Sequence, residues 1–160
     1  MNELRAPTAT IEAQVRWLVD RASISDLLFR FARALDTKDF AAYTALYASD
    51  GVLELPDPRS GSYFTLRQAE LSEALPRSLG RYSGTHHLSC NHQIELSGER
   101  ATSRSYLQAV HVGSEPRQHW SAGGWYDCEY RREQGSWRFT RVRLTAVWLD
   151  GEPGEIRPEP

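Results

Sequence analysis

This chain has few cysteines and no long apolar run, and each shortage excludes a class of protein. The two cysteines, Cys90 and Cys128, are isolated and form no CxxC pair, which indicates reduced thiols in a cytoplasmic protein. No apolar stretch approaches the roughly 18 residues of a membrane span, and the first seven residues lack the apolar core of a signal peptide. We therefore expect a cytoplasmic protein with no membrane partner.

Charge of one sign is not in excess either. The net charge is −2, so no overall field draws the chain to nucleic acid or to anionic lipid, and we expect no nucleic-acid partner. Lys38 is the only lysine, and the remaining basic residues are arginines, several of them between residues 131 and 143. Alternating arginines of an expected strand are typical of a solvated face. The 40% hydrophobic content is ordinary for a globular domain.

The first half of the chain predicts helices. Apolar residues recur at helical spacing over residues 10–20, and Ser23 is expected to cap a second helix that ends near Asp36. Asp39 is expected to cap a third, short helix. A short strand over residues 52–55 and a helix over residues 66–79, broken or kinked by its proline, complete this half.

After Gly84 the period changes from helical to two. Glycines mark two hairpin turns, and the pair Gly123–Gly124 inside a strand pattern predicts a bulge or a close backbone approach. Four long strands are expected, over residues 85–96, 101–112, 119–131 and 137–149.

Helices followed by antiparallel strands argue for an α+β fold, with a curved, mainly antiparallel sheet and the N-terminal helices packed on one face. At 160 residues one domain is the default. We expect a flexible N-terminus over residues 1–10, a single domain over 11–150 and a loose tail over 151–160. A homodimer is also expected, because a curved sheet usually has an outer face that needs cover.

All five histidines fall between His86 and His119, in the strand-rich half. If Ser97 pairs with Ala101 across the first hairpin turn, residues whose numbers sum to 198 lie opposite each other. His87 would then face His111, and two histidines near neutral pH can both take and give a proton.

The placement of His87 and His111 on one face depends on this register, because a slip of one residue moves a side chain to the other face of the sheet. His87 shares its predicted face with polar residues, whereas the opposite face is apolar (Leu88, Cys90, Ile94 and Leu96). The alternative is therefore that His87 lies on the outer face and that His86 points inward.

The sequence gives little indication of a metal site or of a catalytic nucleophile. His86 and His87 are neighbours on a strand, so they point to opposite faces, and no cysteine or carboxylate lies at a familiar ligand spacing. The HExxH zinc motif and the GxSxG nucleophile motif are both absent. We therefore expect a site without metal and without cofactor.

Four segments together resemble the SnoaL-like members of the nuclear transport factor 2-like superfamily. They are Leu35-Asp36-Thr37-Lys38-Asp39-Phe40, Leu46-Tyr47-Ala48-Ser49-Asp50-Gly51-Val52, Thr85-His86-His87-Leu88 and the arginine-rich strand from Trp137 to Trp148. The resemblance covers about Ile11 to Gly151 and implies a conical α+β barrel, in which helices close an apolar pocket against the concave face of the sheet. The superfamily holds many different activities, so the resemblance specifies fold more than reaction.

Within that superfamily the site resembles that of scytalone dehydratase, which implies Asp36, His87 and His111 as catalytic residues. The two pocket tyrosines of the dehydratase fall on Leu35 and Leu55 here, so Leu55 is an expected pocket residue and substrate activation has to differ. Tyr126 and Trp148 are further candidates for pocket walls, because aromatic side chains suit ring substrates. The alternative for both is core packing.

The function that follows is a cofactor-free, dehydratase-like lyase that uses His/Asp acid–base chemistry on a cyclic hydroxylated or ketonic small molecule. An isomerase or a polyketide-cyclase-like enzyme of the same fold is one alternative. A non-catalytic module that binds a small molecule or serves as a subunit is the other.

Overall fold

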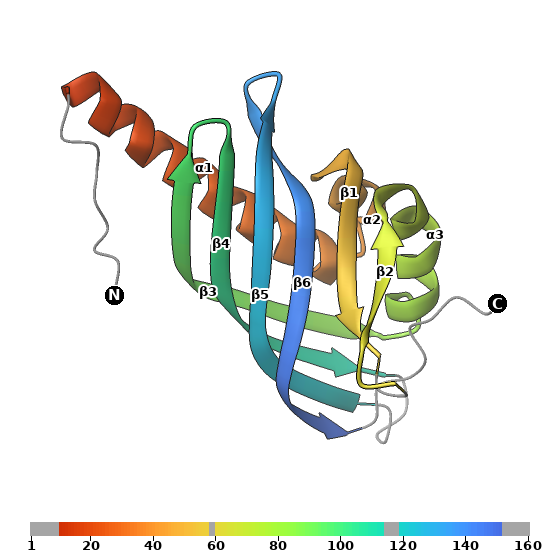
Figure 1. The fold of residues 1–160 in the computed structure, drawn as a ribbon. Helices are drawn as coiled ribbons and strands as arrows, with labels where there is room; N and C mark the ends of the chain where they lie inside the picture. The colour runs from red at the N-terminus through yellow and green to blue at the C-terminus, as the bar shows by residue number, and fades with distance from the viewer. Residues whose placement is uncertain (1–9, 58–59, 114–118, 152–160) are drawn as a thin grey trace.

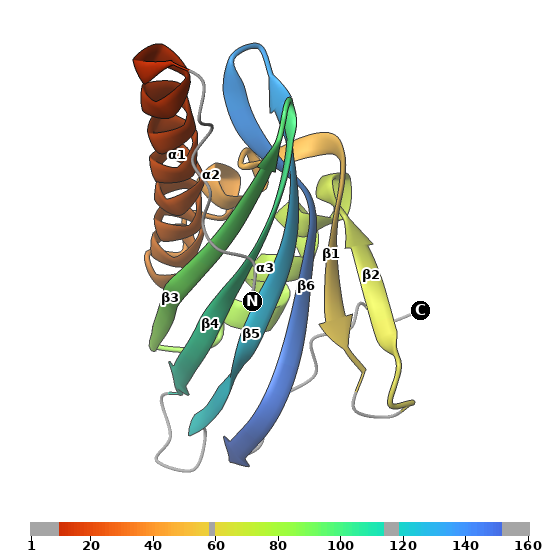
Figure 2. The same ribbon diagram turned by 60° about the vertical axis from the view of Figure 1, so that its left-hand side comes forward.

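The computed structural model describes residues 10–57, 60–113 and 119–151 (Figure 1). The flexible ends expected over residues 1–10 and 151–160 lie outside this range, apart from Thr10 and Gly151. The fold is α+β, as the sequence predicts: three helices lie on one side of a curved sheet of six strands (Figure 2).

Helix α1 (Ile11–Asp36) is one continuous helix of 26 residues. Its N-cap is Thr10, whose hydroxyl accepts a hydrogen bond from the Ala13 amide. The prediction that Ser23 caps a separate helix is wrong: the Ser23 hydroxyl donates to the Val19 carbonyl inside α1. Serine is common both at caps and in such back-bonded positions, so its presence does not show where a helix begins.

The end of α1 is sharply defined. Lys38 has a φ of +56°, the left-handed conformation that stops a helix. The Lys38 amide donates to the Leu35 carbonyl, and the Asp39 amide donates to the Ala34 carbonyl, which together form a Schellman motif. Asp36 is therefore fixed as the last helical residue.

Short elements follow. Asp39 caps α2 (Phe40–Thr44) as predicted, by accepting from the Ala42 amide. Strand β1 (Tyr47–Pro56) is longer than predicted, and its partner β2 (Tyr63–Arg67) lies where the sequence predicts a loop and the start of a helix. Helix α3 (Gln68–Leu79) runs through Pro76, which does not end it, and stops one turn later.

The second half forms the long strands that the period change predicts. They are β3 (Gly84–Ser97), β4 (Arg100–Val112), β5 (His119–Glu133) and β6 (Ser136–Gly151). The strand order is β2-β1-β6-β5-β4-β3, and every neighbouring pair is antiparallel except β1 with β6. Figure 1 shows how these strands bend along their length, so that the sheet wraps around the helices. The register of β5 with β6 shifts at Gly123–Gly124, but the extra residue is Val147 of β6, so the expected bulge is not in β5. The alternative of a close backbone approach is confirmed, because a Cβ at Gly124 would clash with the Thr145 carbonyl oxygen.

The first hairpin differs from the predicted pairing at its turn. Only residues 98 and 99 form the turn, so Ser97 pairs with Arg100 rather than with Ala101. This moves the register by one residue, which taken alone would place His87 and His111 on opposite faces.

A bulge further along β3 moves the register by one residue more. Asn91 and His92 together occupy the space opposite one β4 residue, and His87 then pairs with Ala109. The prediction that His87 lies directly opposite His111 is therefore wrong. Because the two shifts add to an even number, both histidines still share one face, as diagonal neighbours.

The core lies between α1 and the concave face of the sheet. Phe31 of α1 is 2% exposed and packs edge-on against Tyr126 and Phe139 of the sheet. Tyr43 of α2 closes the same cluster with its ring centroid 4.9 Å from that of Phe31. This aromatic contact fixes α1 across the sheet and sets where its last turn, with Asp36, meets β3.

Candidate functional site

Asp36 lies at the C-terminal end of α1, where the helix dipole disfavours a negative charge. Three donors offset this. The Thr85 hydroxyl lies 3.1 Å from Oδ1, the His87 amide donates to Oδ2 at 3.0 Å, and the His87 ring donates to Oδ1 at 2.7 Å. The His87 amide is available because β3 is an edge strand of the sheet.

These hydrogen bonds decide the charge of Asp36. Burial raises the pKa of this carboxyl, but the hydrogen bonds from the ring and the amide of His87 outweigh burial and hold the pKa below its ordinary value. Asp36 is thus a carboxylate near neutral pH. Its contact with Nδ1 places the His87 ring proton on that atom and leaves Nε2 as the basic nitrogen.

His111 is buried beside this pair and is only 2% exposed. Its ring centroid lies 5.1 Å from that of His87, with the two planes at 89°. Burial lowers the pKa of His111 to about 3, and the neighbouring His87 adds to this effect. His111 is therefore a neutral imidazole at physiological pH, and within the described residues its Nδ1 has no hydrogen-bond partner.

Both histidines line a cavity of ≈ 90 Å³ between the sheet and the helices. Its wall is mainly apolar, with leucines from α1, α3, β1, β2, β4 and β6 and with Ser78 at the end of α3. Leu55 and Tyr126 line this cavity, in agreement with their predicted position. Trp148 does not: it is 44% exposed, and its indole covers Gly123 on the outer face of the sheet.

The sequence left open whether Tyr126 lines the pocket or packs in the core, and in the structure it does both. It packs in the core, with its ring centroid 5.2 Å from that of Phe31, and it also faces the cavity. Burial raises the pKa of Tyr126, and the negative charge of Asp36 contributes, so the phenol stays protonated. Tyr126 is thus a neutral wall residue.

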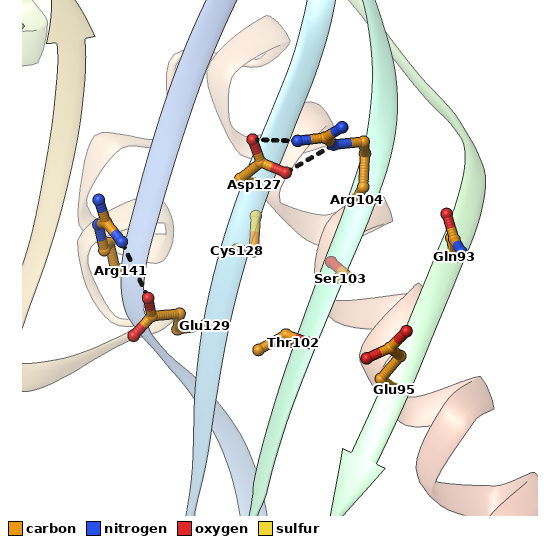
Figure 3. Close-up of a pocket in the computed structure, with 9 residues that line it drawn as sticks. All are labelled: Gln93, Glu95, Thr102, Ser103, Arg104, Asp127, Cys128, Glu129 and Arg141. Atoms are coloured by element: carbon orange, nitrogen blue, oxygen red, sulfur yellow. Dashed lines mark hydrogen bonds and ion pairs between the residues drawn. The ribbon is translucent and has the colours of Figure 1, made fainter. Parts of the chain in front are cut away.

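A second hollow lies on the outer face of the sheet, over β3, β4, β5 and β6 (Figure 3). Figure 3 shows two pairs among its charged side chains, Arg104 with Asp127 and Arg141 with Glu129, and Glu95 lies beside them. Charges that neutralise each other on an exposed face are typical of a solvated sheet surface. The concave cavity is therefore the better candidate site.

Among the residues that the structure describes, no group of three or more histidine, cysteine, aspartate or glutamate side chains is arranged to hold a metal ion. The described helices include none that is both long and apolar enough to cross a membrane. His86, the alternative inward histidine, is exposed, whereas the side chain of His87 is only 6% exposed.

Sequence reasoning missed two aromatic residues of the site. Trp120 of β5 stacks on His111 with the ring centroids 3.8 Å apart, and Tyr82 after α3 meets the edge of the same histidine. Trp120 pairs with His111 across β4 and β5. The pairing could be found only from the β4–β5 register, and the connection between these strands is too long to define it.

Comparisons with known proteins agree with the fold. The sequence matches the model of the SnoaL-like domain over residues 16–143. No curated protein matches it significantly. A solved protein from Kribbella flavida has a TM-score of 0.76 at 27% identity, over 84% of this chain and 95% of its own.

Two solved proteins from Novosphingobium share the fold at lower identity. A provisionally assigned scytalone dehydratase from Novosphingobium aromaticivorans has a TM-score of 0.77 at 21% identity, covering 86% of this chain and 91% of its own. The LinA-type3 hexachlorocyclohexane dehydrochlorinase of Novosphingobium barchaimii has a TM-score of 0.72 at 16% identity, covering 91% and 99%. The family match spans most of the chain and the architecture agrees with it, so this chain belongs to the SnoaL-like domain family of the nuclear transport factor 2-like superfamily.

Proposed function

We propose that this protein is a cofactor-free lyase of the dehydratase type, acting on a small cyclic hydroxylated or ketonic molecule. The observation that supports this most is the Asp36–His87 pair at the edge of an apolar cavity, 2.7 Å from atom to atom. A carboxylate that orients a histidine is the usual way to make an imidazole a general base at neutral pH.

In the proposed reaction, His87 Nε2 removes a proton from the carbon next to a carbonyl group. The electron pair of that C–H bond forms the new double bond as the C–O bond to the β-hydroxyl group breaks. The hydroxyl leaves with the proton returned by His87, so the products are water and an unsaturated ketone. Asp36 stabilises the imidazolium that exists between the two transfers.

His111 takes a different role, because it is neutral and Asp36 forms its hydrogen bond to a ring with His87. A neutral imidazole can donate a hydrogen bond to the substrate carbonyl oxygen as negative charge develops there. In this mechanism His87 is the base, oriented by the Asp36 carboxylate, and His111 is the uncharged hydrogen-bond donor to the carbonyl oxygen of the substrate.

The wall of the cavity indicates an uncharged substrate. None of the described residues that line the cavity is an arginine or a lysine, and Asp36 places a negative charge at its edge, which disfavours carboxylates and phosphates. The cavity volume of ≈ 90 Å³ is below the roughly 300 Å³ of an ordinary ligand pocket. A ring substrate therefore has to displace wall side chains such as Leu75 and Leu79 of α3.

Two structural relatives named for eliminations, a dehydratase and a dehydrochlorinase, support a lyase in preference to other activities of the superfamily. An isomerase or a cyclase would use the same proton abstraction but would return the proton to carbon or form a new carbon–carbon bond. A non-catalytic binding module would use the cavity alone.

Product analysis separates these functions. Incubation with a panel of β-hydroxy ketones and polycyclic phenols is expected to release water and give an unsaturated product, detected by mass spectrometry, and Asp36→Asn should abolish it. An isomer of unchanged mass would indicate an isomerase. Binding without turnover across the panel would contradict the lyase.

A further inference from the structure

His111 is held in place by packing. No described residue forms a hydrogen bond with its buried Nδ1, although a histidine of an active site is usually oriented by such a bond. Three rings surround it. Trp120 lies parallel to it, at an interplanar angle of 4°, and His87 and Tyr82 meet it edge-on at 89° and 62°. The parallel indole is the contact that defines the plane of the imidazole.

Trp120 is itself fixed by a hydrogen bond. Its indole Nε1 donates to the Tyr82 hydroxyl at 2.8 Å, and the donor and the acceptor come from segments 38 residues apart. The Arg81 guanidinium donates to the same hydroxyl at 3.0 Å and lies over the Tyr82 ring. Trp120 is 8% exposed and Tyr82 is 5% exposed, so the hydrogen bond between them is shielded from water.

We propose that Trp120 is a positioning residue for His111, and that the Tyr82 hydroxyl sets the plane of the Trp120 indole. This inference rests on the proposed function, in which His111 meets the substrate oxygen. Tyr82 does not line the cavity, so it acts on the substrate only through Trp120 and His111.

Orientation by stacking has a chemical consequence that a hydrogen bond would not have. A carboxylate on one ring nitrogen fixes the tautomer, as Asp36 does for His87. A stacked indole fixes only the plane of the ring and leaves the tautomer open. The substrate oxygen can then select the tautomer that donates to it, while the neutral state of His111 is kept by burial.

The test is nuclear magnetic resonance of the ligand-free protein with ¹⁵N-labelled histidine, compared among wild type, Trp120→Leu, Trp120→Phe and Tyr82→Phe. In wild type, the carbon-bound protons of the His111 ring should be shifted upfield by the indole face. Trp120→Leu should remove most of that shift and broaden the signals. Trp120→Phe, which keeps an aromatic ring, should retain much of the shift.

Tyr82→Phe is the gentler variant, since it removes one oxygen and keeps the ring. It should move the Trp120 indole N–H signal and the His111 ring signals together. Trp137→Phe is the matched control: Trp137 is also buried and donates its indole N–H, to Asp20 at 3.3 Å, but it does not line the cavity. It should leave the His111 signals unchanged.

With a substrate in hand, Tyr82→Phe should lower kcat by about 10-fold to 100-fold with little change in KM, because a misoriented catalytic group affects the transition state more than binding. Unchanged His111 signals in folded Trp120→Leu or in Tyr82→Phe would overturn the proposal. If the signals respond but no substrate of the panel is turned over, the positioning role stands and the lyase function fails.

Discussion

Asp36 carries a negative charge at the C-terminal end of a helix, where such a charge is unfavourable, and this makes the residue a candidate for function. A carboxylate at the C-terminus of a helix opposes the helix dipole, and this one is retained by three hydrogen bonds, two of them from His87. A residue whose local cost is offset by contacts that include a titratable side chain is a strong candidate for function. The resemblance to scytalone dehydratase implied Asp36 and His87 as site residues, and the sequence pattern placed Asp36 near the end of a helix and His87 in a strand.

The first prediction concerns catalysis. Asp36→Asn, His87→Ala and His111→Ala should each lower kcat by about 10²-fold to 10⁴-fold, the usual loss when one proton-transfer group is removed. His86→Ala, the exposed neighbour on the opposite face, is the matched control and should keep the wild-type rate. EDTA should have no effect. Wild-type rates in the Asp36 and His111 variants would reject the mechanism, and inhibition by EDTA would favour a bound metal.

The second prediction concerns pH and stability. The pKa of His111 is about 3 in the folded state, below its value of about 6.5 in an unfolded chain. Between these values the unfolded state binds the extra proton, so the free energy of unfolding should fall as the pH is lowered. The slope reaches at most about 1.4 kcal/mol per pH unit for one such group.

Urea unfolding of wild type and His111→Phe at pH 7, 6, 5 and 4 measures this slope. As the pH falls from 7 to 4, the free energy of unfolding should decrease more for wild type than for His111→Phe. The Asp36 carboxylate has a lowered pKa, so its contribution is lost only below about pH 4, outside this window. Parallel pH profiles for wild type and the variant would show that His111 is not held neutral.

At the scale of elements, the β3–β4 hairpin shows how far pairing arithmetic can be trusted. The predicted register was off by one residue at the turn and by one more at the bulge. Either shift alone would put His87 and His111 on opposite faces of the sheet. Together they move the register by two residues, which changes the partner of His87 but keeps both histidines on one face. The shared face of the two histidines was therefore found for a reason that was partly wrong.

The same bulge explains why the faces of β3 were misjudged. Strict alternation groups Leu88 with Ile94, yet Leu88 is 45% exposed and Ile94 is 3% exposed. The extra residue at Asn91 changes which side points inward, so His87 faces the core before the bulge and Ile94 faces it after. Asn91, with a φ of +55°, is a residue type that tolerates this conformation, but the sequence alone does not mark the position.

The third prediction follows from this bulge. Deleting Asn91 should remove the bulge, so that the β3 residues on one side of it turn their buried side chains outward. The protein should then lose about 3 kcal/mol or more of stability or fail to fold. Asn91→Gly is the control, since glycine accepts the positive φ and keeps the residue count, and it should stay within about 1 kcal/mol of wild type. Urea unfolding measures both. A deletion variant with wild-type stability would show that the bulge does not set the register.

At the scale of the whole molecule, the sequence predicted the α+β class and the long strands, because period and turn signals are local. The cavity on the concave face was implied only by the resemblance to the SnoaL-like family. The sequence did not predict β2, the parallel pairing of β1 with β6 or the uncovered half of α1. These features depend on contacts between distant segments. The apolar positions that marked the first helix, such as Val15 and Leu18, are in fact 52% and 58% exposed.

Among the described residues, apolar side chains are exposed on α1 and on the outer face of the sheet. The fourth prediction is that one of these two surfaces joins two copies. On the outer face of the sheet, Leu88, Tyr106 and Trp148 are each between 44% and 54% exposed, and such a face usually marks an interface. We expect a homodimer of twice 18.2 kDa in sedimentation velocity, formed through the sheet. Tyr106→Glu should convert it to monomer, because a charge in the centre of an apolar interface is costly to bury.

Val15→Glu on the exposed stripe of α1 is the matched variant, since it places the same charge on the other open surface. If the sheet forms the interface, this variant stays dimeric. Dissociation by Val15→Glu and not by Tyr106→Glu would move the interface to the helix, and a single species of 18 kDa in wild type would refute the dimer. Because the cavity lies on the concave face, dissociation through the outer face should leave the Asp36–His87 site and its activity intact.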